Sequence, residues 1–228
     1  MISNSSPGSS ITLHILDCGF GLGFLVETPG GLFLIDCGSP GQQGKVLEKM
    51  HELGRSDLKL IWITHAHYDH YGSAAALRDL TGARIGVHPA DANDLAAGKS
   101  RLGTARKVGF SYMAIQPVVN AAWRLKPTRP DFTLEDGESL DRFGLNAVIY
   151  YTPGHTPGHT SVVLEDGTAF AGDLIGGFPK PALQSLLATD WNQLPASLAH
   201  LQAANPEWVY SGHSHRAVPG DLFQQIPG

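Results

Sequence analysis

The chain has 228 residues, 42% of them hydrophobic and 16% charged, and a formal net charge of −5 at pH 7. This composition is ordinary for a globular protein with one core, and the acidic balance gives no overall attraction to nucleic acid or to an anionic membrane. No apolar run approaches the roughly 20 residues of a membrane helix. The first ten residues lack the basic and apolar regions of a signal peptide, so we expect a cytoplasmic protein.

We expect residues 1–10 to form a flexible polar tail and residues 11–228 to form a single domain. Alternating apolar runs then predict a β-meander and the elements that follow it. The predicted strands of this first part cover residues 11–16, 23–28, 32–38, 58–64 and 83–88. Helical spacing and a glycine at the end predict helices over residues 44–54 and 71–82.

Residues 89–130 interrupt this alternation, and we interpret them as a helical, lid-like insertion. The alternation then resumes towards the C-terminus. We predict strands over residues 145–152, 159–165, 168–173 and 207–213, with a helix over residues 190–204. Strands and helices share the chain from end to end, which indicates a layered α/β protein.

The stretch THAHYDH, residues 64–70, holds three histidines and one aspartate at the end of a predicted strand. A lone histidine is usually a packing or surface residue. His65, His67, Asp69 and His70 are too closely spaced at one strand end for that interpretation to suffice. Imidazole nitrogens and carboxylate oxygens are the ligands that suit zinc, iron or manganese, so the stretch predicts a metal site.

Further candidate ligands follow later strands. They are His155 or His159 in the tandem TPGHTPGH, Asp173 in AGDLIGG and His213 in SGHSH. Ligand sites in layered sheets collect at one end of the strands, so residues far apart in sequence can meet there.

This ordered set resembles the metallo-β-lactamase-fold hydrolase superfamily, in its branch of glyoxalase II-like and uncharacterised hydrolases. The family signature is His-x-His-x-Asp-His, followed by a single His, an Asp and a final His. The resemblance spans about residues 11–215. It implies an αββα four-layer sandwich of two mixed sheets flanked by helices, whereas the residues alone indicate only α/β layers.

The resemblance also implies a ligand set for two divalent metal ions. Zinc is the expected metal, and iron and manganese are the alternatives. One ion is held by His65, His67 and His155, the other by Asp69, His70 and His213, and Asp173 bridges the two. We prefer His155 to His159 because the first His of the family's Gly-His-Thr motif is the ligand. His155 also lies in the turn, whereas His159 begins the next strand. Asp36, in an early strand that ends Asp-x-Gly as in the family, is expected to orient the site from behind the ligands.

The chemistry that the resemblance implies is hydrolysis by a hydroxide shared between two metals, with Asp69 and Asp173 as the catalytic residues that position and deprotonate the water. The absence of a Gly-x-Ser-x-Gly stretch from the sequence fits that mechanism. An ester, thioester, lactone or phosphoester of a small molecule is the expected substrate. The bridging Asp argues against a true β-lactamase. Gly176, where lactonases commonly carry Tyr, weakens a lactonase interpretation. We find no basic cluster for glutathione near the C-terminus.

Charge is unevenly distributed along the chain. Residues 91–130 carry a net +5 and the remainder −10. The basic residues of this segment are Lys99, Arg101, Arg106, Lys107, Arg124, Lys126 and Arg129, and Phe110, Tyr112, Met113 and Trp123 lie among them. We weigh two interpretations equally: a lid in which Arg101 and Arg106 receive an anionic substrate, and a solvated helix pair or dimer contact. The oligomeric state stays open, a homodimer included.

His159 and His215 flank the ligand motifs and are candidates for contacts behind the ligands or with substrate. Two other functions compete with the hydrolase. The first is a mononuclear iron persulfide dioxygenase of the same fold. The second is a metal-bound binding or regulatory protein, which would lack a ligand, and none is missing here.

Overall fold

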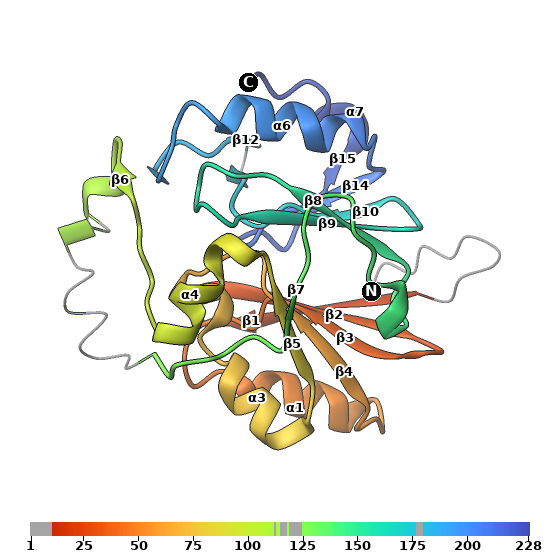
Figure 1. Cartoon of the computed structure of the whole chain (residues 1–228). Coiled ribbons are helices and arrows are strands. Elements are labelled where there is room, and N and C mark those ends of the chain that lie inside the picture. The colour runs from red at the N-terminus through yellow and green to blue at the C-terminus, as the bar shows by residue number, and fades with distance from the viewer. Residues whose placement is uncertain (1–10, 112, 115–117, 119–124, 177–179) are drawn as a thin grey trace.

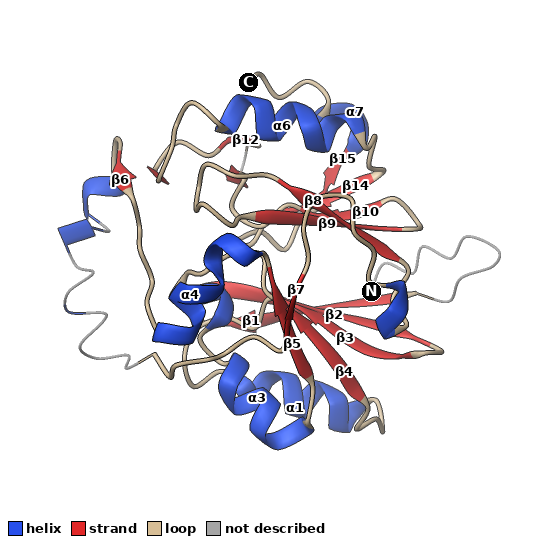
Figure 2. Ribbon diagram, viewed as in Figure 1, coloured by secondary structure: helices blue, strands red, loops and turns tan. Residues whose placement is uncertain are grey.

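The computed structural model describes residues 11–111, 113–114, 118, 125–176 and 180–228. Two sheets lie face to face, and helices cover the outer face of each (Figures 1 and 2). This is the αββα sandwich that the resemblance implied. None of the helices in the described ranges combines the length and the apolar character that crossing a membrane requires. The predicted tail, together with Tyr112, Trp123 and Arg124 of the insertion, lies outside the described residues.

The first sheet has the strand order β1-β2-β3-β4-β5-β7. Its strands are β1 (Thr12–Cys18), β2 (Gly21–Thr28), β3 (Gly31–Ile35), β4 (Leu58–Trp62), β5 (Arg84–Val87) and β7 (Phe132–Thr133). The first three form the predicted antiparallel meander, and β3, β4, β5 and β7 run parallel. The carboxyl ends of the parallel strands therefore share one edge.

The helices that pack side chains into the outer cluster of this sheet are α1 (Gln43–Glu52), α2 (Tyr68–Tyr71), α3 (Ala74–Thr81) and α4 (Pro89–Ala97). Side chains of a strand alternate between faces, so Leu32 and Leu34 pack into the outer cluster with the helices, while Phe33 points to the second sheet. Helix α3 ends at Gly82, as its sequence predicted, in a left-handed conformation with a φ of +75°.

The start of the predicted insertion belongs to the core. Leu95 of α4 is fully buried in the outer cluster, so residues 89–97 form part of the helical layer. The local signals for this helix were Pro89 at its first position and Gly98 just past its end. These two residues alone do not define a helix, because the segment between 89 and 130 has no sustained apolar period.

The second sheet has the strand order β15-β14-β10-β9-β8. Its strands are β8 (Ala147–Tyr151), β9 (Thr160–Leu164), β10 (Thr168–Phe170), β14 (Trp208–Tyr210) and β15 (Val218–Pro219). Helices α6 (Leu194–Ala203) and α7 (Gly220–Phe223) cover its outer face. Another core cluster lies between the sheets, where Phe24 and Trp62 pack with Val162 and Phe170. Full burial of each such side chain contributes about 1.5–3 kcal/mol.

Two small sheets extend from the sandwich. Strand β6 (Thr104–Ala105) pairs with β13 (Leu187–Ala188), and β11 (Ile175–Gly176) pairs with β12 (Ala182–Leu183). Strands of two residues are too short to show a period of alternation, so the sequence did not predict them. A 3₁₀ turn (Asp141–Phe143) completes the elements that bear on the core.

Candidate metal centre

The candidate ligands lie where the strands end. His65 and His67 follow β4, and Asp69 and His70 lie in the short helix α2. The other three follow the strands of the second sheet: His155 after β8, Asp173 after β10 and His213 after β14. The structure therefore brings residues separated by almost 150 positions to one edge of the sandwich.

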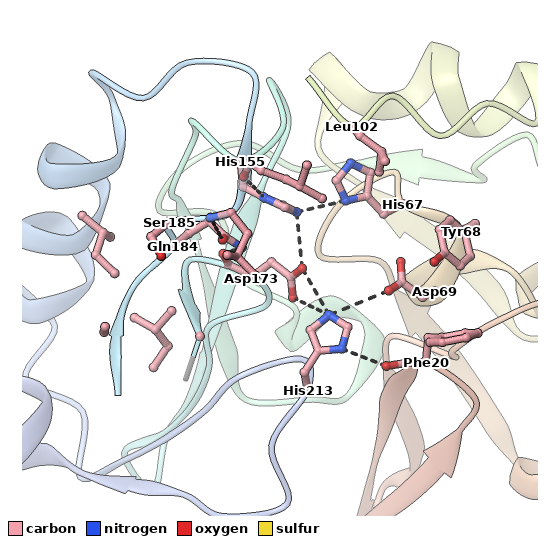
Figure 3. Close-up of a pocket in the computed structure, with 16 residues that line it drawn as sticks. Phe20, His67, Tyr68, Asp69, Leu102, His155, Asp173, Gln184, Ser185 and His213 are labelled. Carbon is pink, nitrogen blue, oxygen red and sulfur yellow. Dashed lines mark hydrogen bonds and ion pairs between the residues drawn. The ribbon is translucent and has the colours of Figure 1, made fainter. Parts of the chain in front are cut away.

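One group consists of His65, His67, His155 and Asp173, whose ligand atoms all lie within 4.8 Å of one another. Nδ1 of His67 is 3.0 Å from Nε2 of His65 and 2.9 Å from Nε2 of His155. Oδ2 of Asp173 is 3.4 Å from Nε2 of His155 (Figure 3). All four residues are buried. Three imidazole nitrogens and a carboxylate oxygen thus converge away from solvent.

The second group consists of Asp69, His70 and His213, whose ligand atoms are likewise within 4.8 Å of one another. Asp173 lies between the two groups. Its Oδ1 is 3.4 Å from Nε2 of His70 and 3.2 Å from Nε2 of His213. Nε2 of His213 is in turn 3.8 Å from Oδ2 of Asp69 (Figure 3).

Each of these five histidines has its outward nitrogen held by an oxygen of the protein. Because that nitrogen donates a hydrogen bond, the inward nitrogen carries the lone pair whenever the ring is neutral, which is the arrangement that a metal ligand requires. The pairs are His65 Nδ1 with Thr64 Oγ1 (3.0 Å), His67 Nε2 with the carbonyl of Arg101 (2.9 Å), His155 Nδ1 with the carbonyl of Leu187 (2.9 Å), His70 Nδ1 with Asp36 Oδ2 (2.8 Å) and His213 Nδ1 with the carbonyl of Phe20 (2.8 Å).

Asp36 lies behind the ligands. Its Oδ1 accepts the backbone N–H of Thr64 at 2.8 Å, and its Oδ2 accepts the Thr64 hydroxyl at 2.7 Å as well as Nδ1 of His70. Asp36 itself has a φ of +57°, a left-handed conformation that costs a residue with a side chain about 1–2 kcal/mol. Such strain persists where the surroundings impose it, as they do here. Asp36 therefore orients His70 directly and His65 through Thr64.

His159 also lies behind the ligands, and both of its nitrogens are engaged. Nδ1 donates to the carbonyl of Thr152 at 2.9 Å, and Nε2 accepts the backbone N–H of Asp173 at 3.0 Å. Burial lowers the pKa of His159 to about 4, so the ring is neutral at pH 7 and can accept that hydrogen bond. Between the two histidines of the tandem motif, His155 is the one whose Nε2 joins the ligand cluster.

Three other candidate side chains have partners away from the centre. His215 contacts Asp17 on the surface, with 2.7 Å between Nε2 and Oδ1. The guanidinium of Arg101 is largely exposed and lies 3.0 Å from Asp94. The remaining candidate is Arg106, whose guanidinium stacks 4.2 Å from the centre of the Trp191 ring. Neither arginine nor His215 lines the pocket beside the centre. The positions of Arg101 and Arg106 therefore do not support their predicted contact with an anionic substrate.

The two groups differ in protonation. Burial lowers the pKa of His65, His67 and His155, which keeps these rings neutral. In the second group, Asp173 raises the pKa of His213 to about 9. Burial opposes a charge on His70, but Asp173 and Asp36 outweigh it and raise the pKa of His70 well above its usual value. Without metal, positive imidazolium groups face the Asp173 carboxylate.

Two buried polar atoms at the centre have no hydrogen-bond partner among the described residues. They are Nε2 of His70 and Oδ1 of Asp173, which face each other across 3.4 Å. The chain also keeps this space open, because a Cβ atom at Gly212 would lie 2.5 Å from Cε1 of His70 and 2.9 Å from Oδ1 of Asp173. Orphaned nitrogen and oxygen atoms in a histidine and carboxylate cluster fit divalent zinc, iron or manganese.

Asp91, in the first turn of α4, was not recognised from the sequence, where it entered only as a charge. Its side chain is buried and accepts three hydrogen bonds. Oδ2 accepts the N–H of Ala66 at 2.8 Å and the hydroxyl of Thr156 at 2.7 Å, and Oδ1 accepts the N–H of Gly158 at 2.7 Å. Ala66 lies between His65 and His67, and Thr156 follows the third histidine of that group. Asp91 therefore ties together the two loops that carry the first group of ligands.

A pocket of about 470 Å³ opens beside the centre. His67, Asp69, His155, Asp173 and His213 line one side of it (Figure 3). The ligand atoms are therefore accessible to a small molecule, which is what a site of chemistry requires.

Comparison with known proteins agrees with this geometry. Residues 16–213 match the family described as the metallo-beta-lactamase superfamily. The hydroxyacylglutathione hydrolase GloC of Haemophilus influenzae is 30% identical over 164 residues, which cover 68% of this chain and 70% of that protein. An uncharacterized protein of Bacillus subtilis, YobT, is 29% identical over 207 residues, or 83% of this chain and 81% of its own. A hydroxyacylglutathione hydrolase of Pseudomonas aeruginosa is 32% identical over 117 residues, which span only 32% of its length.

Solved structures with the same fold include proteins of this superfamily. TTHA1623, solved in a di-iron-bound form, has a TM-score of 0.65 and 26% identity, with 91% of this chain and 93% of that chain covered. A metallo-beta-lactamase from Cronobacter sakazakii has a TM-score of 0.64 and 26% identity, with coverage of 91% and 75%. The fold, the histidine and aspartate cluster and the family match agree, and the chain belongs to the metallo-beta-lactamase superfamily.

Proposed function

We propose that the protein is a dinuclear metal-dependent hydrolase that cleaves an ester, thioester, lactone or phosphoester bond of a small molecule. The observation that carries this proposal is the position of Asp173 between two groups of ligands. Its Oδ2 lies 3.4 Å from Nε2 of His155 in the first group, and its Oδ1 lies 3.4 Å from Nε2 of His70 in the second. A single metal would leave one of these groups without a function.

The ligands divide in the way that this role requires. His65, His67 and His155 would hold one cation, Asp69, His70 and His213 would hold the other, and Asp173 would contact both. When bound, two divalent cations, zinc foremost, would supply an acidified water as the nucleophile and polarise the oxygen of the scissile group.

The carboxylates of Asp69 and Asp173 line the pocket, where they would orient the attacking water and take up its proton. The position of Asp173 is fixed from behind. His159 accepts its N–H at 3.0 Å, and Nε2 of Gln184 donates to its carbonyl at 3.2 Å. This support fixes the backbone that carries the carboxylate before substrate arrives, and preorganisation of this kind is a source of catalytic advantage.

The competing functions make different demands on the site. A mononuclear iron persulfide dioxygenase needs one ion, and the second ligand group, with its orphaned His70 nitrogen, favours two. A regulatory protein without turnover needs no access to its metal, whereas this pocket reaches five of the candidate ligands.

The test is the Asp173→Asn variant, which keeps the shape of the side chain and removes its charge. We expect the purified variant to lose about one equivalent of metal and to hydrolyse p-nitrophenyl and thioester substrates at least ~10³-fold more slowly than the unaltered protein. Asp221→Asn, in α7 and exposed, is the matched control and should behave as the unaltered protein does. Two retained metals and normal turnover in Asp173→Asn would refute the proposal.

A further inference from the structure

The pocket beside the metal centre also has apolar lining residues. They are Leu102, Ile175, Leu183, Leu186 and Leu187, which we call the leucine wall. Ile175 and Leu102 are almost fully buried, so these two side chains are packed in place before any ligand arrives. The ring of Phe20 also lines the pocket and is 62% exposed (Figure 3).

The leucine wall is tied to the ligands through the backbone. Ile175 comes two residues after Asp173 and pairs with Leu183 between β11 and β12. The carbonyl of Leu187, in β13, accepts Nδ1 of His155 at 2.9 Å. Leu102 follows Arg101, whose carbonyl accepts Nε2 of His67. The distance between the wall and the centre is therefore set by the same segments that orient the ligands.

The Gln184 side chain, which also lines the pocket, already has hydrogen-bond partners within the protein. The Gln184 side chain donates from Nε2 to the carbonyl of Asp173 at 3.2 Å and accepts the N–H of Leu186 through Oε1 at 2.8 Å. Among the residues that the structure describes, no lysine or arginine side chain lines the pocket. A substrate carboxylate or phosphate placed against the wall would lose its hydration without a lysine or arginine to pair with it, which is unfavourable.

We infer that the substrate carries an uncharged, apolar acyl chain of medium length, which lies against the leucine wall while its carbonyl faces the metal centre. This inference rests on the proposed hydrolase function for the bond that is broken. Water adds to the acyl carbon, the bond from that carbon to oxygen or sulfur breaks, and the proton of the water passes to the leaving group. The products are a carboxylic acid with an apolar chain and an alcohol or thiol.

The first test is a series of p-nitrophenyl esters from acetate to decanoate, hydrolysed by the zinc-loaded protein. Each methylene buried against the wall should raise kcat/KM by about fourfold until the pocket is filled. The p-nitrophenyl monoester of glutarate, with a terminal carboxylate, should react at least tenfold more slowly than the neutral hexanoate. Rates that do not depend on chain length, or a faster reaction of the glutarate ester, would overturn the inference and leave the hydrolase standing.

Leu183→Asp places a charge in the wall. This variant should slow hydrolysis of the octanoate at least 30-fold and that of the acetate less than threefold, and Leu183→Ala should show the same pattern more weakly. Leu222→Asp, at an exposed leucine of α7, is the matched control and should change neither rate. Equal losses on the acetate and the octanoate in Leu183→Ala would contradict a chain-binding role.

A second measurement does not depend on turnover. Calorimetry with neutral methyl ketones should give binding to 2-decanone at least 100-fold tighter than to 2-butanone, with the difference reduced in Leu183→Asp. Tight binding of the long ketone without hydrolysis of any ester would support the apolar site and reject the proposed function. Equal binding of the two ketones would reject the apolar site.

Discussion

The two groups of ligands at the centre differ in burial and in charge. His65, His67 and His155 are enclosed, and burial keeps their rings neutral, ready to donate a lone pair. In the second group, the side chain of His213 is 42% exposed, and His213 and His70 are protonated in the metal-free protein. One edge of the fold therefore carries a preformed site beside a site at which metal competes with protons.

The largest effect should come from removing one ligand from each group, because the two variants should then retain different amounts of metal. His67→Ala removes a member of the enclosed group, so we expect loss of both metals and a fall in turnover of at least ~10³-fold. His213→Ala should keep about one equivalent of metal in the enclosed group and lose the second. Elemental analysis of both variants, with thermal melts as a folding control, checks this. Equal metal loss in the two variants would mean that the groups are not distinct.

The metal affinities of the two ligand groups should depend differently on pH. Asp173 raises the pKa of His213 from 6.5 to about 9, so metal must displace a proton from this residue at pH 7. The apparent affinity for the second metal should rise by up to ~10-fold per pH unit, for each proton displaced, between about pH 6.5 and 9. The first group is neutral throughout and should show little dependence. Zinc titration by calorimetry in several buffers measures both the affinity and the protons released.

The protonation of His213 can also be tested without metal, through the pH dependence of the protein's stability. The raised pKa of His213 means that its ion pair with Asp173 stabilises the metal-free fold fully below about pH 6.5, and that this contribution is lost as the pH rises through about 9. His213→Ala should remove this dependence. A second-site affinity that does not change with pH would contradict the assigned protonation.

A smaller effect should come from Asp91→Asn. The amide nitrogen of asparagine cannot accept the hydrogen bonds that the carboxylate accepts. The loops that carry Ala66 and Thr156 therefore lose part of the hydrogen bonding that joins them. We expect a metal affinity of the first group ~10–100-fold lower, measured by chelator competition, and a loss of stability of about 1–3 kcal/mol. Asp94→Asn, on the same helix but paired with Arg101, should leave metal affinity unchanged. Equal effects of the two variants would assign Asp91 to helix stability alone.

The fold and the ligand cluster could be predicted because their signals are local. Histidines placed directly after apolar strands, as in THAHYDH, combine a strand period with ligand chemistry in one short stretch, and the order of the later motifs carries the family resemblance. The supports behind the ligands gave no such signal. The carbonyls of Arg101 and Leu187 are main-chain groups that any residue would supply, and Asp91 acquires its partners only when α4 packs beside the ligand loops.

The basic segment shows why charge along the sequence does not by itself place side chains at the centre. The positive balance of residues 91–130 suggested an anion-binding lid, but Asp94 and the Trp191 ring engage the guanidinium groups of Arg101 and Arg106 locally. The apolar surface that does face the centre comes from short strands far along the chain, Ile175–Gly176 and Leu187–Ala188, which have no period to recognise. The choice of zinc, a cytoplasmic location and a homodimer stay predictions from the sequence.

The proposed hydrolase function requires that one chain hold two metal ions, one on either side of Asp173. The most direct test is elemental analysis of the protein purified without added metal and without a histidine tag. The proposed hydrolase predicts close to two equivalents of zinc, iron or manganese per chain. About one equivalent of iron alone, together with oxygen uptake in the presence of a persulfide, would contradict it and assign the chain to the dioxygenases of this fold.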